Sequence, residues 1–237
     1  MIIPIEHIKS FTECPRYYRL SLDVVPALIP FRHSVIESVI KEAYLQAIET
    51  GFRMDWKRVI HLVDAQIFKG VDIEDPEKYE NGKQLATHIL ESLQKWYHTL
   101  YLESNMETYV DIPMKTVVSK HTVHGIIPML QLCKEVPIIT TISDLSMNQS
   151  RLYNNLSIRA LAWLVQKELN CEAVKINGLG IGARGALDMV QIWIGQEDHK
   201  RVDTTIEQVV RLIAAGVNYP SVTEKCNTCA FMGGCKL

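Results

Sequence analysis

The hydrophobic pattern of this chain changes character near Glu103, and this change limits the possible fold more than any other feature of the sequence. Before it, a short helix is expected within the first twenty residues, and apolar residues at helical spacing predict helices over 31–51, 56–68 and 76–101. After it, short β-branched runs broken by Pro, Gly or His predict a mostly antiparallel sheet between residues 107 and 143.

The remainder of the chain alternates again between the two patterns. An amphipathic helix is predicted over 149–169, strands over 173–179 and 186–194, and a last helix over 203–215 that ends at Gly216. The glycines between residues 178 and 185 indicate a turn between the two strands rather than a phosphate-binding loop. The fold class is therefore α+β, with an α/β-type core of one sheet flanked by helices.

Length and composition exclude several classes of protein. A chain of 237 residues with 47% hydrophobic and 22% charged residues can bury a core and is neither disordered nor a coiled coil. No apolar run approaches the ~18 residues of a membrane span, and the first residues lack the pattern of a signal peptide. We therefore expect no membrane association and a cytoplasmic location. The net charge of −2 does not by itself indicate a nucleic-acid-binding protein.

Six cysteines in a chain without an export signal are more typical of metal ligands, catalytic thiols or core residues than of disulfides. Three of them, Cys226, Cys229 and Cys235, have the spacing C-x2-C-x5-C in a glycine-containing tail. Three thiolates in so short a segment can surround a metal centre and leave one position for a fourth ligand. The candidates for that position are a histidine and the other three cysteines, Cys14, Cys133 and Cys171, of which the last two have the surroundings of buried core residues. Zinc and a [4Fe–4S] cluster are both compatible with this set.

The N-terminal segment Ser-Phe-x-x-Cys-Pro-Arg-x-Tyr, over residues 10–18, together with the cysteine-rich tail resembles the iron–sulfur branch of the RecB-type PD-(D/E)XK nucleases. This branch includes the CRISPR-associated RecB-like exonucleases and the AddB nuclease domain. The resemblance implies a single PD-(D/E)XK-like domain over residues 1–237, in which a [4Fe–4S] cluster joins the two chain ends. It implies four cluster ligands, Cys14, Cys226, Cys229 and Cys235. Residues 1–103 would form a mostly helical part with the first cluster cysteine, 104–215 the sheet core, and 216–237 the cluster-binding tail.

The catalytic motifs of that family are only partly present. Four positions match its pattern of a helix histidine, a strand acid and Q-x3-Y, and the resemblance implies that they are remnant catalytic residues: His33, Asp144, Gln149 and Tyr153. Pro128 stands where a metal-binding aspartate should follow Gly125, and Ser146 stands where the lysine should be. An alternative role for Asp144 is a helix cap or turn residue. Because Mg²⁺ or Mn²⁺ is held by a few carboxylates and phosphate oxygens, we predict that metal-dependent cleavage is lost.

The sequence therefore predicts a non-cleaving iron–sulfur protein that serves as a DNA-binding or scaffold component in DNA replication, recombination or repair. The partners would be DNA, as single strands or ends, and another DNA-processing protein. The single-domain format resembles stand-alone members encoded by viruses and mobile elements. Two alternatives remain open, an active Mg²⁺- or Mn²⁺-dependent single-strand exonuclease with relocated groups, and a zinc-stabilised protein–protein interaction module. Basic residues that could form a groove for DNA are Arg16, Arg19, Arg32, Lys41, Arg151, Arg159 and Arg184.

Overall fold

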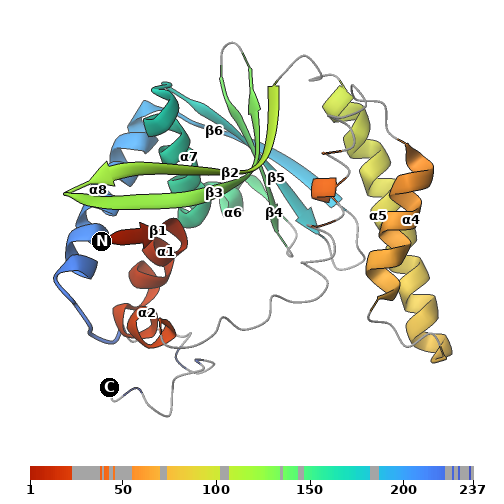
Figure 1. Cartoon of the computed structure of the whole chain (residues 1–237), viewed down its shortest axis with the longest axis horizontal. Coiled ribbons are helices and arrows are strands. Elements are labelled where there is room, and N and C mark those ends of the chain that lie inside the picture. The colour runs from red at the N-terminus through yellow and green to blue at the C-terminus, as the bar shows by residue number, and fades with distance from the viewer. Residues whose placement is uncertain are drawn as a thin grey trace.

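The computed structural model contains a six-stranded mixed sheet with helices on both faces (Figure 1). It describes residues 1–22, 38, 40–42, 45, 55–69, 74–101, 107–133, 136–143, 147–181, 187–221, 226, 229 and 235. The described strands are β1 (Ile2–Pro4), β2 (Glu107–Val118), β3 (His121–Leu132), β4 (Ile138–Ser143), β5 (Val174–Ile181) and β6 (Leu187–Ile194). The described helices are α1 (Ile5–Glu13), α2 (Pro15–Ser21), α4 (Trp56–Phe68), α5 (Pro76–Tyr101), α6 (Gln149–Asn154), α7 (Leu156–Leu169) and α8 (Gln196–Ala214).

The long strand β3 organises the sheet because both of its edges are used. One edge pairs along its whole length with β2 in an antiparallel ribbon. The other edge is shared by two strands, with β1 parallel to residues 122–124 and β4 antiparallel to residues 129–131. Strand β4 continues into the sheet through parallel pairing with β5, which pairs antiparallel with β6. Among the described strands, none pairs with residues 125–128 of β3 on the β1/β4 edge.

At the centre of the β2–β3 ribbon, the side chains that pack into a hydrophobic core change from one face of the ribbon to the other. Asp111 and Pro128 lie opposite each other there, between the pairs Val110–Met129 and Ile112–Ile127. Ile127 packs in one core and Met129, two residues later, packs in the other, although residues two apart in a regular strand share a face. Proline has no N–H for the ladder, and the backbone of Asp111 has a φ of 51° in the left-handed region. The two residues therefore mark an irregularity that lets one ribbon serve both cores.

Two clusters of buried apolar side chains hold the sheet between its helices. The larger one joins α1, α7 and α8 to one face, and Trp163 of α7 is fully buried within it. The smaller one joins α4 and α5 to the other face through Met129 and Leu179. Gly125 allows α1 and α7 to approach β3, since a Cβ there would lie 2.9 Å from Ile5 Cγ2.

Several expectations from the sequence are confirmed and several are wrong. The helices at 56–68 and 76–101 have the predicted bounds. Most of the helix expected over 31–51 lies outside the described residues, although residues 38, 40–42 and 45 are helical. The antiparallel arrangement expected between residues 107 and 143 is confirmed, since β3 pairs antiparallel with both β2 and β4. The sheet as a whole is mixed, because β1 and β5 add parallel pairs. The expected breaks at Pro113 and within 121–132 do not occur, since the ribbon remains paired on both sides of these residues.

Two helix boundaries also differ from the prediction. The helix expected over 149–169 is two helices, because Asn155 leaves the helical conformation and its side chain accepts the N–H groups of Ser157 and Ile158 as the cap of α7. Helix α8 begins seven residues before the predicted start, at Gln196, where the sequence is polar and shows no apolar period. Its acidic first turn, with Glu197 and Asp198, suits the positive end of the helix dipole.

Within the part of the chain that the structure describes, no helix has the length and apolar character needed to cross a membrane.

Candidate functional site

The sheet opens where β4 leaves β3. Their pairing ends at Met129–Thr140, and Thr141, Ile142 and Ser143 pair with β5 alone. Pro128 lies directly beside the last β3 pair, at the opening itself. The sequence analysis expected a metal-binding aspartate here from the family resemblance, and the structure places Pro128 at this edge of the opening.

Three of the predicted positions cannot be placed. His33, Asp144 and Ser146 lie outside the described residues. Strand β4, which leads to the last two, is described as far as Ser143.

A carboxylate that the sequence analysis did not single out lies across the ribbon from Pro128. Asp111 of β2 is half-exposed, and its Oδ1 accepts a hydrogen bond from Lys41 Nζ at 2.7 Å. A non-glycine residue in the left-handed region is uncommon, and such positions cluster at functional sites. The sequence contains no signal for this placement, because Asp111 meets Pro128 only through the register of β2 and β3.

Helix α6 carries the predicted Gln149 and Tyr153 and is fixed at both of its ends. Asn148 caps its first turn by accepting the N–H of Arg151 at 2.8 Å. Leu152 is fully buried against Gly178 of β5, where a Cβ would lie 2.9 Å from both of its Cδ atoms. Gln149 is exposed at the start of the helix, whereas Tyr153 is half-buried one turn later.

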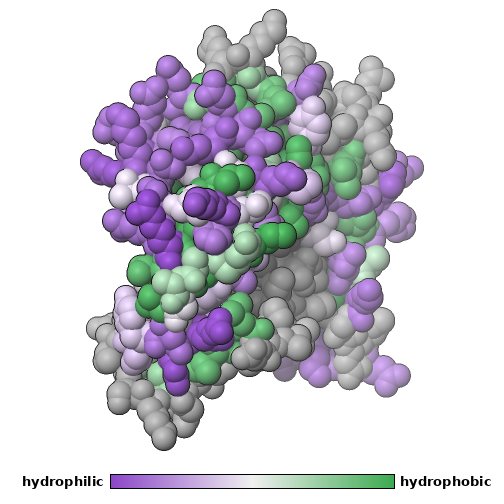
Figure 2. Space-filling model, turned by 60° about the vertical axis from the view of Figure 1, so that its left-hand side comes forward, coloured by the Kyte–Doolittle hydropathy of each residue, from purple (hydrophilic) through white to green (hydrophobic). Residues whose placement is uncertain are grey.

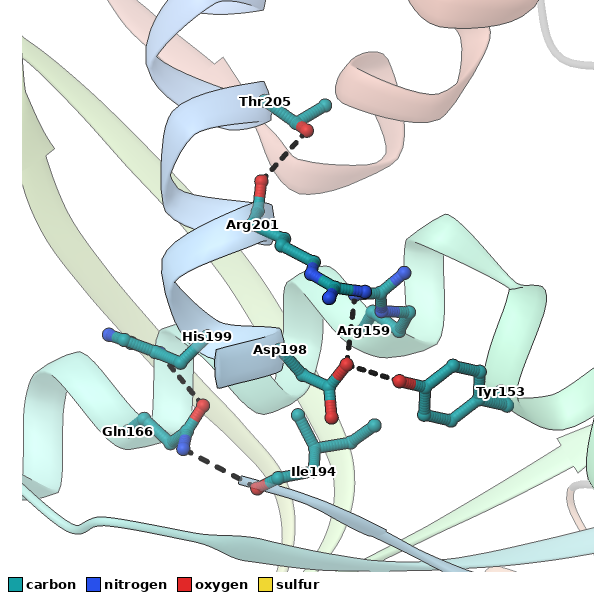
Figure 3. A network of polar contacts seen from close by, with 8 residues as sticks. All are labelled: Tyr153, Arg159, Gln166, Ile194, Asp198, His199, Arg201 and Thr205. Atoms are coloured by element: carbon teal, nitrogen blue, oxygen red, sulfur yellow. Dashed lines mark hydrogen bonds and ion pairs between the residues drawn. The ribbon is translucent and has the colours of Figure 1, made fainter. Parts of the chain in front are cut away.

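Tyr153 belongs to a polar network between α6, α7 and α8 (Figure 3). Its hydroxyl donates a short hydrogen bond to Asp198 Oδ1, and this bond, followed by burial, raises the pKa of Tyr153. The same oxygen of Asp198 lies 3.5 Å from Arg159 NH2, and the Arg159 guanidinium lies 5.2 Å from the centre of the Tyr153 ring. The structure therefore brings Tyr153 together with Arg159 and Asp198, a cluster that the Q-x3-Y motif alone does not predict.

A second set of bonds ties α8 to α7 beside this network. The side chain of Gln166 donates to the carbonyl of Ile194 at 3.5 Å, and its Oε1 lies 2.8 Å from His199 Nδ1. Burial, reinforced by the nearby charge of Lys167, lowers the pKa of His199. Burial acts to raise the pKa of Asp203, but hydrogen bonds from Trp163 and Lys167 outweigh it, so this pKa is lowered. These contacts fix the angle between the two helices that hold the cluster.

Polar side chains are also buried within the sheet itself. The register places Thr140, Asn177 and Gln191 side by side across β4, β5 and β6. Asn177 is 5% exposed, and Gln131 of β3 is fully buried. Neither amide oxygen of these two residues has a hydrogen-bond partner. The β-branched pattern of the strands predicted their positions as sheet but did not identify them as buried polar groups.

The four predicted cluster cysteines form no disulfide and are all half-exposed. Cys14 caps α2, and its Sγ accepts the N–H of Tyr17 at 3.3 Å and the N–H of Ser221 at 3.4 Å. The thiol of Cys226 donates to the carbonyl of the same Ser221 at 3.6 Å. The two ends of the chain are therefore in contact, and Arg16 N–H, which donates to the Tyr219 carbonyl at 3.1 Å, adds to this contact.

The described residues, which include all four of these cysteines, contain no group of three or more His, Cys, Asp or Glu arranged to hold a metal ion. Cys133 and Cys171, predicted as buried core residues, are both half-exposed. Cys171 packs against the larger core just after α7, where burial raises its pKa.

The candidate groove residues do not share one set of contacts. Arg16 lies beside the tail, Lys41 pairs with Asp111, and Arg159 pairs with Asp198. Arg32 and Arg184 lie outside the described residues.

The chain is similar to solved structures and not to any protein-family model. No protein-family model matches the sequence, and none of the curated proteins matches it. A protein from Eubacterium rectale described as a "putative exonuclease" has a similar structure, with a TM-score of 0.56 and 9% identity over 96% of this chain and 86% of that one. The crystal structure of SSO0001 aligns with a TM-score of 0.44 and 13% identity over 99% of this chain and 85% of that one. At 9% identity the likeness to the E. rectale protein concerns the fold alone, and this chain has a nuclease-like fold.

Proposed function

We propose that this protein is a nucleic-acid-binding protein that has kept a nuclease-like fold and lost metal-dependent cleavage, and that it acts as a DNA-binding or scaffold component in DNA replication, recombination or repair. The observation that carries the proposal is Pro128, which stands at the opening between β3 and β4 where a catalytic carboxylate would be needed. A proline offers no side-chain ligand, and Mg²⁺ relies on a small number of carboxylates together with the substrate phosphates.

Binding is tested by titrating a labelled single-stranded oligonucleotide and its duplex with the full-length protein at several salt concentrations. We expect binding that weakens as salt rises, since contacts to phosphates release counterions. Absence of binding to both forms at low salt would refute the nucleic-acid part of the proposal and leave a scaffold role among proteins. Cleavage of the same oligonucleotide with Mg²⁺ or Mn²⁺, abolished by Asp144→Ala, would refute the loss of catalysis.

We further propose that Cys14, Cys226, Cys229 and Cys235 hold a [4Fe–4S] cluster. Soft thiolates are the ligands of such clusters and also of zinc. Three hydrogen bonds support the choice of Cys14. Its sulfur accepts the N–H groups of Tyr17 and Ser221, and the carbonyl of Ser221 accepts the thiol of Cys226. Metal sites commonly assemble on binding, so the cluster would complete an arrangement that the chain ends have begun. When bound, it would hold the two ends together.

The metal content of the protein, purified without oxygen, distinguishes the two metals. We expect iron and sulfide with broad visible absorbance, lost in Cys14→Ser and retained in the control Cys133→Ser. A colourless protein with stoichiometric zinc would refute the cluster and favour the zinc-stabilised interaction module. Equal loss of colour in the Cys133→Ser control would refute this choice of ligands.

A second candidate function, an active nuclease with relocated groups, is favoured by one specific observation. Asp111 lies opposite Pro128 with its carboxylate exposed and paired with Lys41, so a carboxylate and an amine are present next to Pro128, on the neighbouring strand β2 instead of the strand expected. If this pair supports cleavage, Asp111→Asn abolishes it and the control Asp64→Asn, on α4, does not. Cleavage that is unaffected by Asp111→Asn would refute the relocation.

A further inference from the structure

The cluster between α6, α7 and α8 contains more positive charge than its own residues neutralise. Two guanidinium groups, those of Arg159 and Arg201, lie close to the Tyr153 hydroxyl, and each acts to lower the pKa of Tyr153 against the larger effect of Asp198. Figure 3 shows these two guanidinium groups next to each other, with one carboxylate, that of Asp198, below them. The neighbouring Glu197 is already paired with Lys200 at 2.9 Å.

The half-buried guanidinium group of Arg159 has fewer hydrogen-bond acceptors than it has donors. A guanidinium has five N–H donors, and the side chain of Arg159 is only 18% exposed. Its one ion pair is long, at 3.5 Å to an oxygen of Asp198 that Tyr153 also uses. Its Nε is buried, and no acceptor contacts it. Buried donors in native proteins nearly always have partners, so an unpaired Nε requires an explanation.

The side chain of Arg201 is exposed on α8 and makes no ion pair among the described residues. Its charge acts on Glu197, one turn earlier on the helix, which is already paired with Lys200. Figure 3 shows the side chain of Arg201 extending from α8 toward Arg159. An exposed arginine on a helix is ordinarily solvated by water and needs no partner. Here three cations, Arg159, Lys200 and Arg201, face only two carboxylates, those of Glu197 and Asp198, so one positive charge remains in excess.

The position of the cluster relates it to the opening of the sheet. Leu152, the residue before Tyr153, packs against Gly178, and Gly178 pairs with Thr141, the first residue of β4 beyond its pairing with β3. Figure 2 turns the side of the molecule that carries α8 toward the viewer, and hydrophilic residues gather over the upper left part of this view. Through these contacts α6, which carries Tyr153 of the cluster, packs on the strand that borders the opening.

We propose that Arg159 and Arg201 bind a backbone phosphate of single-stranded nucleic acid, in competition with the carboxylate of Asp198. The proposal rests on the proposed nucleic-acid binding and adds the residues that make one of its phosphate contacts. A phosphate oxygen pair matches the fork of a guanidinium and would supply an acceptor for Arg159 Nε. In the free protein the carboxylate of Asp198 holds Arg159 in place. When a phosphate takes over this contact, the negative charge of Asp198 repels the phosphate.

The test is the salt dependence of binding of a fluorescein-labelled oligothymidine to the full-length protein, followed by anisotropy between about 50 and 200 mM salt. Each phosphate contact to a single strand contributes about 0.7 to the slope of log K against log salt, so Arg201→Gln and Arg159→Gln should each reduce the slope by about 0.7 and weaken binding about fivefold at about 0.1 M salt. Asp198→Asn should act in the opposite direction and tighten binding by about fivefold, because it removes a like charge about 4 Å from the phosphate and keeps an acceptor for Tyr153.

The matched control is Arg211→Gln, which removes an exposed arginine of the same helix that is paired with Glu207 at 2.6 Å. It should leave slope and affinity as in the unmodified protein. If Arg159→Gln does not fold, Arg201→Gln and Asp198→Asn still test the phosphate site. A network that only stabilises the fold would give no gain of affinity for the oligonucleotide in Asp198→Asn. Binding by the unmodified protein with slopes equal in all variants would overturn this assignment and leave the proposed function standing. No binding by the unmodified protein would overturn both.

Discussion

The packing of α6 on the sheet depends on the absence of a side chain at Gly178. A Cβ built there would lie 2.9 Å from Leu152 Cδ1 and Cδ2 and 3.1 Å from Met147 Cγ. Real Cβ atoms almost never approach other atoms to 2.9 Å, so at least one group must move. Leu152 is fully buried and Met147 is 6% exposed, so neither can turn out into solvent. Gly178→Ala therefore has to displace α6 or the strand beneath it.

The expected cost follows from two opposing effects. Forcing an extra methyl group into a packed core costs about 1–3 kcal/mol. The alanine also restricts the unfolded chain, which returns about 0.4–1 kcal/mol. The free energy of unfolding should therefore fall by about 0.5–2 kcal/mol. For a chain of this length, about 1 kcal/mol lowers the melting temperature by about 2–4 °C, so we expect a decrease of about 1–8 °C.

The assay is thermal and urea unfolding followed by circular dichroism, with Gly195→Ala as the control. A Cβ at Gly195 meets no atom within 4 Å, so this second glycine lacks the clash and should change the stability little. Combining Gly178→Ala with Leu152→Ala should cost less than the sum of the two single changes, by about 0.5–3 kcal/mol, because the shortened Leu152 makes room for the new methyl group. A melting temperature that is unchanged or raised in Gly178→Ala, or strict additivity in the double variant, would refute the close packing of α6 on β5.

Two further predictions concern the cap of α7 and two half-buried histidines. Asn155→Ala removes the cap that accepts the N–H groups of Ser157 and Ile158 and should lower the free energy of unfolding by about 1 kcal/mol in urea titrations; an unchanged midpoint would show that the break between α6 and α7 does not need the cap. Burial lowers the pKa of both His7 and His199 below the ordinary histidine value of 6.5, so the unfolded chain takes up protons before the folded one does. Stability should therefore be complete above about pH 6.5 and should decrease as the pH falls below it. His7→Gln and His199→Gln should each flatten this dependence in melts across that range, and a pH profile that neither variant changes would contradict the burial of both rings as neutral groups.

The sequence predicted the elements with strong periodicity and missed those set by local or distant partners. Helices α4 and α5 have their predicted bounds because their apolar residues repeat regularly. The start of α8 was missed because its first residues are polar and are held by contacts to α7, such as Gln166 with His199. The break at Asn155 was missed because the apolar period continues through it, although a helix-capping residue is visible there in the sequence.

The candidate site divides in the same way. The substitution of Pro128 for an acid is readable from the sequence, because it depends on residue type and on spacing from Gly125. The placement of Asp111 opposite that proline depends on strand register, which brings together residues 17 positions apart. The contact between Cys14 and Ser221 joins residues 207 positions apart, which no local pattern relates.

By itself the sequence determined the fold class and the chemical character of the chain, because periodicity, glycine and proline positions and cysteine spacing act locally. The tertiary structure decided which groups meet. It joined Tyr153 to Asp198 and Arg159, placed Arg201 beside them, and set Asp111 across from Pro128. These contacts link segments far apart in the chain, and packing between helices and the register of strands fix them through many small interactions that no local pattern records.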